Sequence, residues 1–254
     1  MDETQKIIKE FYNRKEYIEK AAKSSNSRNK FILSIAINFV GKFVLELGCG
    51  VGSLGSYFGE KYIGVDISLT ALKQVSNRNR ICADISCLPI KDNSIDMVFS
   101  ICTLEHIPDP QKVLDECIRI LKPGGLVLHD DAWHCCSRVG NPIYHKSLSS
   151  CSCREILLKL FWSVLSLKIV KGVLLFPQRI KREIQLIIKR NPKLNFKKLT
   201  PNLEQVYGGD ADAFAAIDSH AVALYYIYHG FILIRPRSIF SRIMHRGTVI
   251  CKKP

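Results

Sequence analysis

The sequence lacks an uninterrupted apolar run of the length that crosses a bilayer. Its most apolar stretch, Leu157 to Phe176, is broken by Lys159, Lys168 and Lys171, whereas a transmembrane helix needs about 20 consecutive apolar residues. A transmembrane helix is therefore not expected. The same stretch could lie in a membrane interface, but we interpret it as a helix that covers an active site.

Zinc-knuckle spacing is also absent, although the chain has ten cysteines. No two cysteines are separated by a gap of two residues, and several lie within apolar runs. Because no secretory signal precedes them, we expect buried thiols and a cytoplasmic location rather than a disulfide framework. Thiolates and imidazoles suit zinc, but this spacing predicts no metal site in the one cluster that they form. Its members are His129, His134, Cys135, Cys136, His145, Cys151 and Cys153.

Acidic residues are outnumbered by basic ones, 23 against 37, which gives a net charge of +14. The basic excess is concentrated after about residue 137. Nucleic acid, an anionic membrane surface and a phosphorylated substrate would all suit this charge, and charge alone does not choose among them. A solvated basic face that serves solubility fits equally well.

The order of apolar and polar segments predicts an α/β core with two additions. Short apolar strands alternate with helices over residues 41–132 and 210–254, which indicates a parallel sheet with right-handed crossovers. Residues 1–40 are expected to be a helical cover, with one helix from Glu3 to Lys23 and a second from Asn29 to Val40. Residues 133–209 are expected to be a basic helical insertion that serves as a lid or substrate-binding cap. The expected strands are 43–47, 62–65, 80–83, 95–100, 126–129, 231–234 and 248–251, and the expected core helices are 53–58, 69–76, 110–121 and 219–229.

A glycine-rich turn follows the first expected strand. Gly48, Gly50 and Gly52 have the spacing GxGxG, and glycine lets the backbone approach a ligand closely because it has no Cβ and tolerates positive φ. The spacing differs from the GxGxxG fingerprint, in which a helix N-terminus is directed at a pyrophosphate. A plain tight turn would also explain these glycines.

Acidic residues end the second and third strands. Asp66 is placed where a carboxylate can accept both ribose hydroxyls of an adenosyl group. Asp84 could accept the exocyclic amino group of the adenine. Either residue could instead cap a helix or form a turn, since aspartate favours both places.

With these features in place, residues 40 to 130 resemble the class I S-adenosylmethionine-dependent methyltransferases, in particular the subgroup that methylates small molecules. The resemblance implies a Rossmann-like seven-stranded, mostly parallel sheet whose last strand is antiparallel. The helical insertion expected from the residue pattern would then lie between strands 5 and 6. It also implies S-adenosylmethionine as cofactor at the carboxyl ends of the first strands. Seven ordered blocks carry it: Val44–Gly52, Gly64–Ser68, Ala83–Ile85, Leu88–Ile90, Ser94–Val98, Leu104–Ile107 and Arg119–Gly125.

The resemblance further implies which residues bind the cofactor. The glycine backbone would face the methionine and the ribose, Asp66 the ribose, Asp84 the adenine, and the residues after the fourth strand the methionine end. The family has no universal catalytic residue, and many members act by holding the acceptor in line with the methyl group. The expected cofactor-binding set is Glu46, Gly48, Cys49, Gly50, Gly52, Asp66, Ile67, Asp84, Ile85, Ile101, Cys102 and Thr103.

A hydroxyl acceptor would benefit from a general base, and a neutral histidine suits that role near neutral pH. His106, just after the fourth strand, is the first candidate. His129 with Asp130 and Asp131, at the end of the fifth strand, is the second, because a nearby carboxylate would raise the pKa of the imidazole and orient it. Each histidine could instead be a structural one whose hydrogen bonds go to the backbone.

The acceptor itself is the least determined feature. No Asn-Pro-Pro-Tyr-like or Asp-Pro-Pro-Tyr-like sequence follows the fourth strand and no RNA-binding motif is visible, so nucleic acid is not an expected partner. The stretches 208–213, 217–220 and 245–247 resemble bacterial methyltransferases encoded among enzymes of surface glycan assembly. That resemblance suggests a sugar hydroxyl on a nucleotide- or lipid-linked carrier, with peripheral contact to an anionic membrane.

Two other functions remain open. One is methyl transfer to an apolar small molecule such as a quinone or polyketide, with the insertion as a hydrophobic lid. The other is a binding protein that keeps the fold without catalysis, which the complete glycine loop and both acids disfavour. The oligomeric state is not determined by the sequence.

Overall fold

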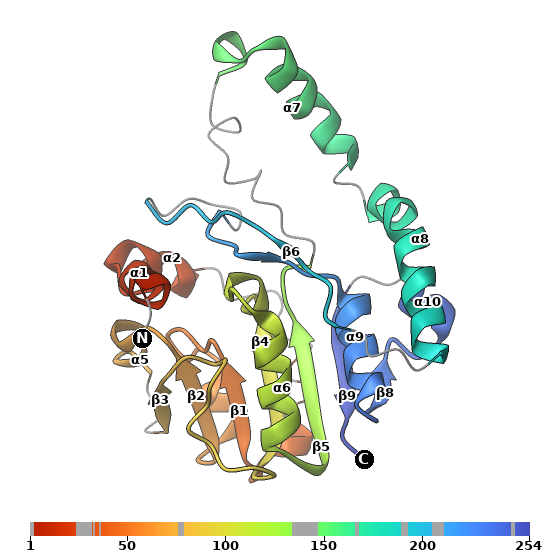
Figure 1. Cartoon of the computed structure of the whole chain (residues 1–254). Coiled ribbons are helices and arrows are strands. Elements are labelled where there is room, and N and C mark those ends of the chain that lie inside the picture. The colour runs from red at the N-terminus through yellow and green to blue at the C-terminus, as the bar shows by residue number, and fades with distance from the viewer. Residues whose placement is uncertain are drawn as a thin grey trace.

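A seven-stranded sheet lies at the centre of the computed structural model, with the strand order β3-β2-β1-β4-β5-β9-β8 (Figure 1). Strands β3, β2, β1, β4 and β5 are parallel, and β9 is antiparallel to both of its neighbours. The predicted Rossmann-like sheet with an antiparallel last strand is therefore confirmed. The strands are β1 Val44–Leu47, β2 Tyr62–Asp66, β3 Arg80–Cys82, β4 Ile95–Ile101, β5 Leu121–Asp130, β8 Ile232–Arg235 and β9 Val249–Lys252.

The structure describes most of the chain and leaves several short segments out. The described residues are 3–23, 32, 34–35, 37–75, 79–133, 147–165, 168–188, 193–204, 211–244 and 247–254. The helices of the sheet layers are η1 Ile37–Phe39, α4 Gly55–Phe58, α5 Leu69–Leu72, η2 Leu104–His106, α6 Pro110–Ile120, α9 Ser219–Tyr228 and α10 Ile239–Met244. The predicted division into residues 1–40, 41–132 with 210–254, and 133–209 remains a prediction.

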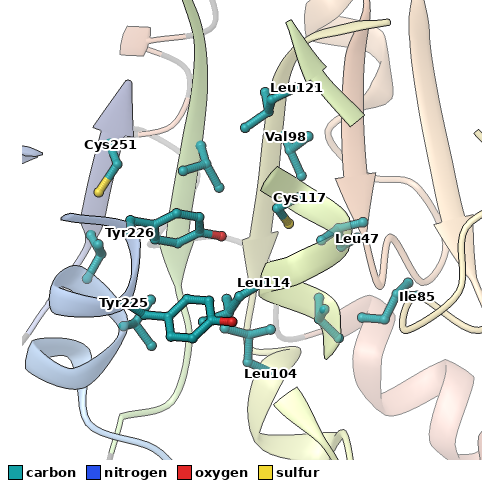
Figure 2. Packing of buried hydrophobic residues seen from close by; sticks show 14 of the residues in the cluster. Leu47, Ile85, Val98, Leu104, Leu114, Cys117, Leu121, Tyr225, Tyr226 and Cys251 are labelled. Carbon is teal, nitrogen blue, oxygen red and sulfur yellow. The ribbon is translucent and has the colours of Figure 1, made fainter. Parts of the chain in front are cut away.

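Alternating strand residues pack on the two faces of the sheet because successive side chains of a strand point to opposite sides. Leu45, Leu47 and Val98 belong to a large buried cluster with residues of α6 and α9 (Figure 2). Val44 and Phe99 belong to a second cluster that includes Phe58 of α4. The sheet is thus the middle layer of three, which is the layer arrangement of an α/β fold.

Two element boundaries differ from the sequence-based expectation by four or five residues, and several others differ by one or two. Strand β5 begins at Leu121 rather than at 126, because Leu121 already pairs with Ile95 of β4 before a shift in register. Helix α5 ends at Leu72 rather than at 76. The Leu72 carbonyl accepts a hydrogen bond from the guanidinium of Arg80 at 2.8 Å, so the chain turns toward β3 at this point.

The second predicted N-terminal helix, 29–40, lies partly outside the described residues. Residues 3–23 form two helices, α1 (Glu3–Tyr12) and α2 (Lys15–Lys23), so the prediction of one helix over this range is wrong. The break occurs at Asn13. Its side-chain nitrogen Nδ2 donates to the Lys9 carbonyl at 2.7 Å. Its side-chain oxygen Oδ1 accepts from the Ser68 hydroxyl and from the backbone amide of Thr70, both at 3.0 Å. These bonds turn the chain and fix the end of α1 against the start of α5.

The insertion between β5 and β8 contains two long helices, η4 (Leu148–Ser150) and a small antiparallel pair of strands, β6 (Lys197–Lys198) with β7 (Ala215–Ala216). Helix α7 (Cys153–Leu165) extends away from the sheet, whereas α8 (Lys168–Ile187) packs against α9 and α10 (Figure 1). Within the described segments, none of the helices combines the length and the apolar character that crossing a membrane requires.

Buried charges attach α8 to the core. The Arg179 guanidinium donates to both oxygens of Asp218, at 3.0 and 2.6 Å, and Arg182 donates to the same carboxylate at 2.7 Å. Asp218 also caps α9 by accepting from the His220 amide. All three charged side chains of this cluster are buried. Each buried charge therefore needs the hydrogen-bonded partner that this arrangement supplies.

We predict that Asp218→Ala lowers the free energy of unfolding by about 3–5 kcal/mol, because two buried guanidinium groups would lose their shared carboxylate. Urea unfolding followed by circular dichroism measures the effect. Glu19→Ala is the control, since the Lys15–Glu19 ion pair of α2 is solvent-exposed and such pairs contribute little. Equal effects of the two substitutions would contradict the assignment of Asp218 as the anchor of α8.

Candidate functional site

The glycine loop follows β1 at the carboxyl edge of the sheet. Gly48, Gly50 and Gly52 all have positive φ, at 65°, 53° and 70°. A Cβ on Gly48 would lie 2.5 Å from Cγ2 of Thr103, and one on Gly52 would lie 2.7 Å from Cγ1 of Val75. A Cβ on Gly50 would have no atom within 4 Å. Packing therefore requires the outer two glycines, while the middle one borders open space that a ligand can fill.

Asp66 joins the end of β2 to this loop. Its Oδ2 accepts from the Gly50 amide and its Oδ1 from the Ser68 amide, both at 2.8 Å. Burial raises the pKa of the carboxyl above its ordinary value, and the bonds from these amides act in the opposite direction. An ionised carboxylate has about four lone-pair sites, so Asp66 keeps acceptor capacity for the hydroxyls of a ribose. The residues present thus fit an adenosyl group at this position.

Glu46 lies in β1 just before the glycine loop, and Cys49 lies within the loop. Glu46 is buried, accepts a hydrogen bond from the Tyr62 hydroxyl, and has its pKa raised to about 8 by burial. Cys49 is also buried, and a Cβ on Gly64 would lie 2.8 Å from its Sγ. Both side chains therefore pack inside the protein, and any contact that they make with a cofactor remains a prediction.

Asp84 and its neighbour follow β3. The Oδ1 atom of Asp84 accepts from the Ser86 amide at 2.8 Å, while Oδ2 accepts from Nε2 of Gln5 in α1 at the same distance. Ile85 is buried in the main core, and Ile67 packs against the aromatic cluster of α1. Helix α1 therefore covers the positions at which an adenine was expected.

The turn after β4 carries the three residues expected at the methionine end. Cys102 has a positive φ of 50°, which is uncommon for a residue other than glycine. The Thr103 hydroxyl donates to the Leu47 carbonyl at 3.1 Å, and the Thr103 amide donates to Asp131 at 2.9 Å. Ile101 ends β4 beside Asp130 of β5. This turn thus lies next to the glycine loop, and the binding of a cofactor by its residues remains a prediction.

His129 lies in a closed polar network. Its side chain is 0% exposed, its Nδ1 is 2.7 Å from the Ser100 hydroxyl, and its Nε2 is 2.8 Å from the Tyr226 hydroxyl. Burial lowers the pKa of the imidazole to about 3, so the prediction that a nearby carboxylate would raise it is wrong. Of the two predicted partners, Asp130 accepts instead from the Thr248 hydroxyl at 3.0 Å, whereas Oδ2 of Asp131 lies 3.7 Å from Nδ1 of His129. An acceptor could not reach His129 without a rearrangement of the core, so His129 with Asp130 is not placed to act as a general base.

His106 has a different environment. It lies in η2, just after β4, and its imidazole is partly accessible. The Nδ1 atom is 3.2 Å from Oδ2 of Asp212, and Nε2 is 3.7 Å from Oε1 of Glu105. The Tyr12 hydroxyl of α1 donates to the same Asp212 oxygen at 3.0 Å. One histidine thus lies between two carboxylates beside the turn that contacts the glycine loop.

Several residues of this site were not found from the sequence. Tyr12 and Gln5 have no motif that marks them, and Asp212 lies in the stretch 208–213, whose resemblance assigned it no role at this site. The positions of all three depend on contacts between distant parts of the chain. Trp133, three residues beyond the end of β5, has an indole nitrogen without a hydrogen-bond partner. Its place after a parallel strand was a usable signal, since ligands bind at the carboxyl ends of such strands.

The metal cluster considered from the sequence falls mainly outside the described residues. His134, Cys135, Cys136 and His145 belong to the segment 134–146, which the structure does not describe. Where the structure does describe the chain, no three His, Cys, Asp or Glu side chains are arranged to hold a metal ion.

The segment that contains the glycine loop, Asp66 and the turn after β4 is similar to known methyltransferases. Residues 45–129 match the family described as "Methyltransferase domain". A ubiquinone biosynthesis O-methyltransferase of Coxiella burnetii is 35% identical over 100 residues, which are 35% of this chain and 43% of the relative. A malonyl-[acyl-carrier protein] O-methyltransferase of the same organism is 34% identical over 90 residues, which are 34% of this chain and 32% of the relative.

The matches cover the core and not the whole molecule. The chain spans less than half the length of these curated relatives. Among solved structures, an S-adenosylmethionine-dependent methyltransferase from Clostridium acetobutylicum is 25% identical, covers 42% of this chain and 50% of its own, and has a TM-score of 0.37. The insertion and the N-terminal helices therefore have to be interpreted from their own residues.

We predict that His129 stays neutral in the folded protein far below the ordinary histidine range. Its folded pKa of about 3 is lower than the unfolded value of 6.5, so the unfolded state binds the proton first and stability falls as the pH drops from 6.5 toward 3. NMR titration of the imidazole carbons measures the pKa, and His129→Asn should flatten the pH dependence of unfolding. A midpoint near 6.5 for His129 would contradict the closed network.

Proposed function

We propose that residues 45–129, which match a methyltransferase domain, bind S-adenosylmethionine and that the chain transfers its methyl group to a hydroxyl of a small molecule. The observation that carries the proposal is the contact between the glycine loop and Asp66. It sets an open backbone position, Gly50, beside a carboxylate with spare acceptor capacity. This is the combination that an adenosyl group requires.

The chain's own residues hold the donor in this proposal. The Gly48 to Gly52 backbone lines one side, Asp66 binds the ribose hydroxyls, and Asp84 binds the adenine edge after Gln5 gives up its bond. When bound, S-adenosylmethionine supplies an electrophilic methyl group on a positively charged sulfonium. The burial of α1 against Ile67 keeps water away from this side of the site.

A hydroxyl acceptor is supported by the surroundings of His106. The acceptor proton would pass to Nε2, and the imidazolium so formed would be stabilised by Asp212 next to Nδ1 and by Glu105. Tyr12 donates to Asp212 and so fixes the carboxylate that orients the ring. The names of both curated relatives specify transfer to oxygen, which agrees with a base at this place.

The charge of the chain and its exposed apolar residues indicate two classes of acceptor. One is a sugar hydroxyl on a phosphate-bearing carrier, because residues 168–203 contain ten Lys and Arg and a single acid, Glu183. An apolar quinone-like acceptor would instead contact the exposed apolar residues of α7, such as Leu157 and Phe161.

We predict that Asp66→Ala weakens S-adenosylmethionine binding about 10- to 100-fold, because each hydrogen bond to a charged group contributes roughly 1.5–3 kcal/mol. Isothermal titration calorimetry with S-adenosylmethionine and S-adenosylhomocysteine measures the change. Asp92→Ala is the matched control, since Asp92 precedes β4 at the opposite edge of the sheet. If the folded wild type binds neither compound, the chain is a binding protein that keeps the fold without catalysis.

We predict that His106→Ala lowers kcat about 10²- to 10⁴-fold, the usual contribution of a general base, and leaves the affinity for S-adenosylmethionine unchanged. Asp212→Asn should lower kcat less, because it removes the orienting charge and keeps the imidazole. Formation of S-adenosylhomocysteine with catechol-type and sugar acceptors provides the assay. His229→Ala, at an exposed histidine after α9, is the control. Unchanged kcat in His106→Ala would mean that the enzyme acts by positioning alone.

A further inference from the structure

Helix α8 has the reverse of the usual amphipathic arrangement. A surface helix normally turns its apolar stripe to the core and its charges to water. In α8 the charged residues Arg179, Arg182 and Glu183 are buried. The apolar residues Ile184 and Ile187 of the same helix are 54% and 78% exposed.

Several exposed apolar residues along α8 share one side of the helix. Val173, Ile184 and Ile187, together with Ile188 directly after the helix, recur at spacings that place them on one face of a 3.6-residue helix. The buried charges fall on the other face, where Arg179 binds Asp218. The outer face of α8, defined by these four apolar residues, is therefore directed to solvent by ion pairs on the inner side.

Helix α10 repeats the arrangement beside α8. Its Arg242 points inward and donates to both oxygens of Glu183, at 2.7 and 2.6 Å. Phe240 and Met244, one turn apart, are 74% and 46% exposed. Two helices that pack on each other thus both bury charge and expose apolar side chains, and an exposed apolar surface of this kind marks a contact site.

The charge of the residues around this face indicates which kind of partner binds it. Residues 168–203 contain ten basic residues and one acid, Glu183, and residues 219–254 contain six basic residues and no acid. A second copy of the chain would place basic residues against basic residues across a symmetric interface, since the same patch meets itself. An anionic bilayer matches both properties, because it accepts apolar side chains at the acyl boundary and attracts Lys and Arg at the headgroups.

We propose that the outer face of α8, together with Phe240 and Met244 of α10, binds the surface of an anionic lipid bilayer. The apolar side chains enter the boundary between headgroups and acyl chains. Exposed basic residues such as Lys181, Arg235 and Arg237 contact the lipid phosphates. This surface lies outside the residues of the methyl-transfer site, so it does not depend on the acceptor or on catalysis.

The test is co-sedimentation of the full chain with vesicles of phosphatidylcholine alone and of phosphatidylcholine mixed with phosphatidylglycerol. We expect binding to the mixed vesicles, weaker binding as salt is added because screening reduces the attraction, and little binding to phosphatidylcholine alone. The double substitution Ile184→Glu with Ile187→Glu should reduce binding at least tenfold. Phe240→Glu, on the other helix, should reduce it independently.

The matched control is Val40→Glu with Tyr57→Glu. It makes the same change of charge at two apolar residues that are 62% and 53% exposed and lie before β1 and in α4. Its binding should equal that of the wild type. Far-ultraviolet circular dichroism checks that each variant is folded.

Three outcomes would overturn the proposal. The first is failure of the wild type to bind mixed vesicles, and the second is equal loss of binding in the control and in the α8 variant. The third is a stable dimer in light scattering that Ile184→Glu with Ile187→Glu dissociates, because the face would then be an interface between copies of the chain.

Discussion

The carboxylate of Asp131 fixes the edge of the sheet at which the candidate site is built. It accepts from the Ser100 hydroxyl of β4 and from the Thr103 and Leu104 amides of the following turn. Thr103 in turn donates to the carbonyl that precedes Gly48, and its side chain occupies the space that a Cβ on Gly48 would need. One buried carboxylate therefore sets the position of two loops that follow separate strands.

The strands and the glycine loop could be predicted because their determinants are local. An apolar run that ends in glycines or in Asp66 contains both the strand and the turn after it. The partners of His106 could not be predicted in this way. Tyr12 and Asp212 are 200 residues apart in the sequence and meet only after the sheet has formed. The same holds for His129, whose strand position was correct but whose burial depends on Tyr226 of α9.

The orientation of α8 shows a second limit of sequence patterns. Periodicity indicates that a helix has an apolar and a polar side, and the usual rule turns the apolar side inward. The rule does not apply to α8, because Asp218 and Arg242 offer complementary charges to its polar side. Ion pairs are directional, so they also fix the rotation of the helix about its axis. No property of residues 168–187 taken alone carries that information.

Helix α9 connects the outer helices to the floor of the site. Its N-cap, Asp218, binds Arg179 of α8, and its Tyr226 hydroxyl reaches His129. His129 contacts Ser100, which donates to Asp131. These contacts are buried and hydrogen-bonded, so little rearrangement is open to them. The outer face of α8 and the turn that presents Thr103 are therefore both held in place by contacts with one helix, α9.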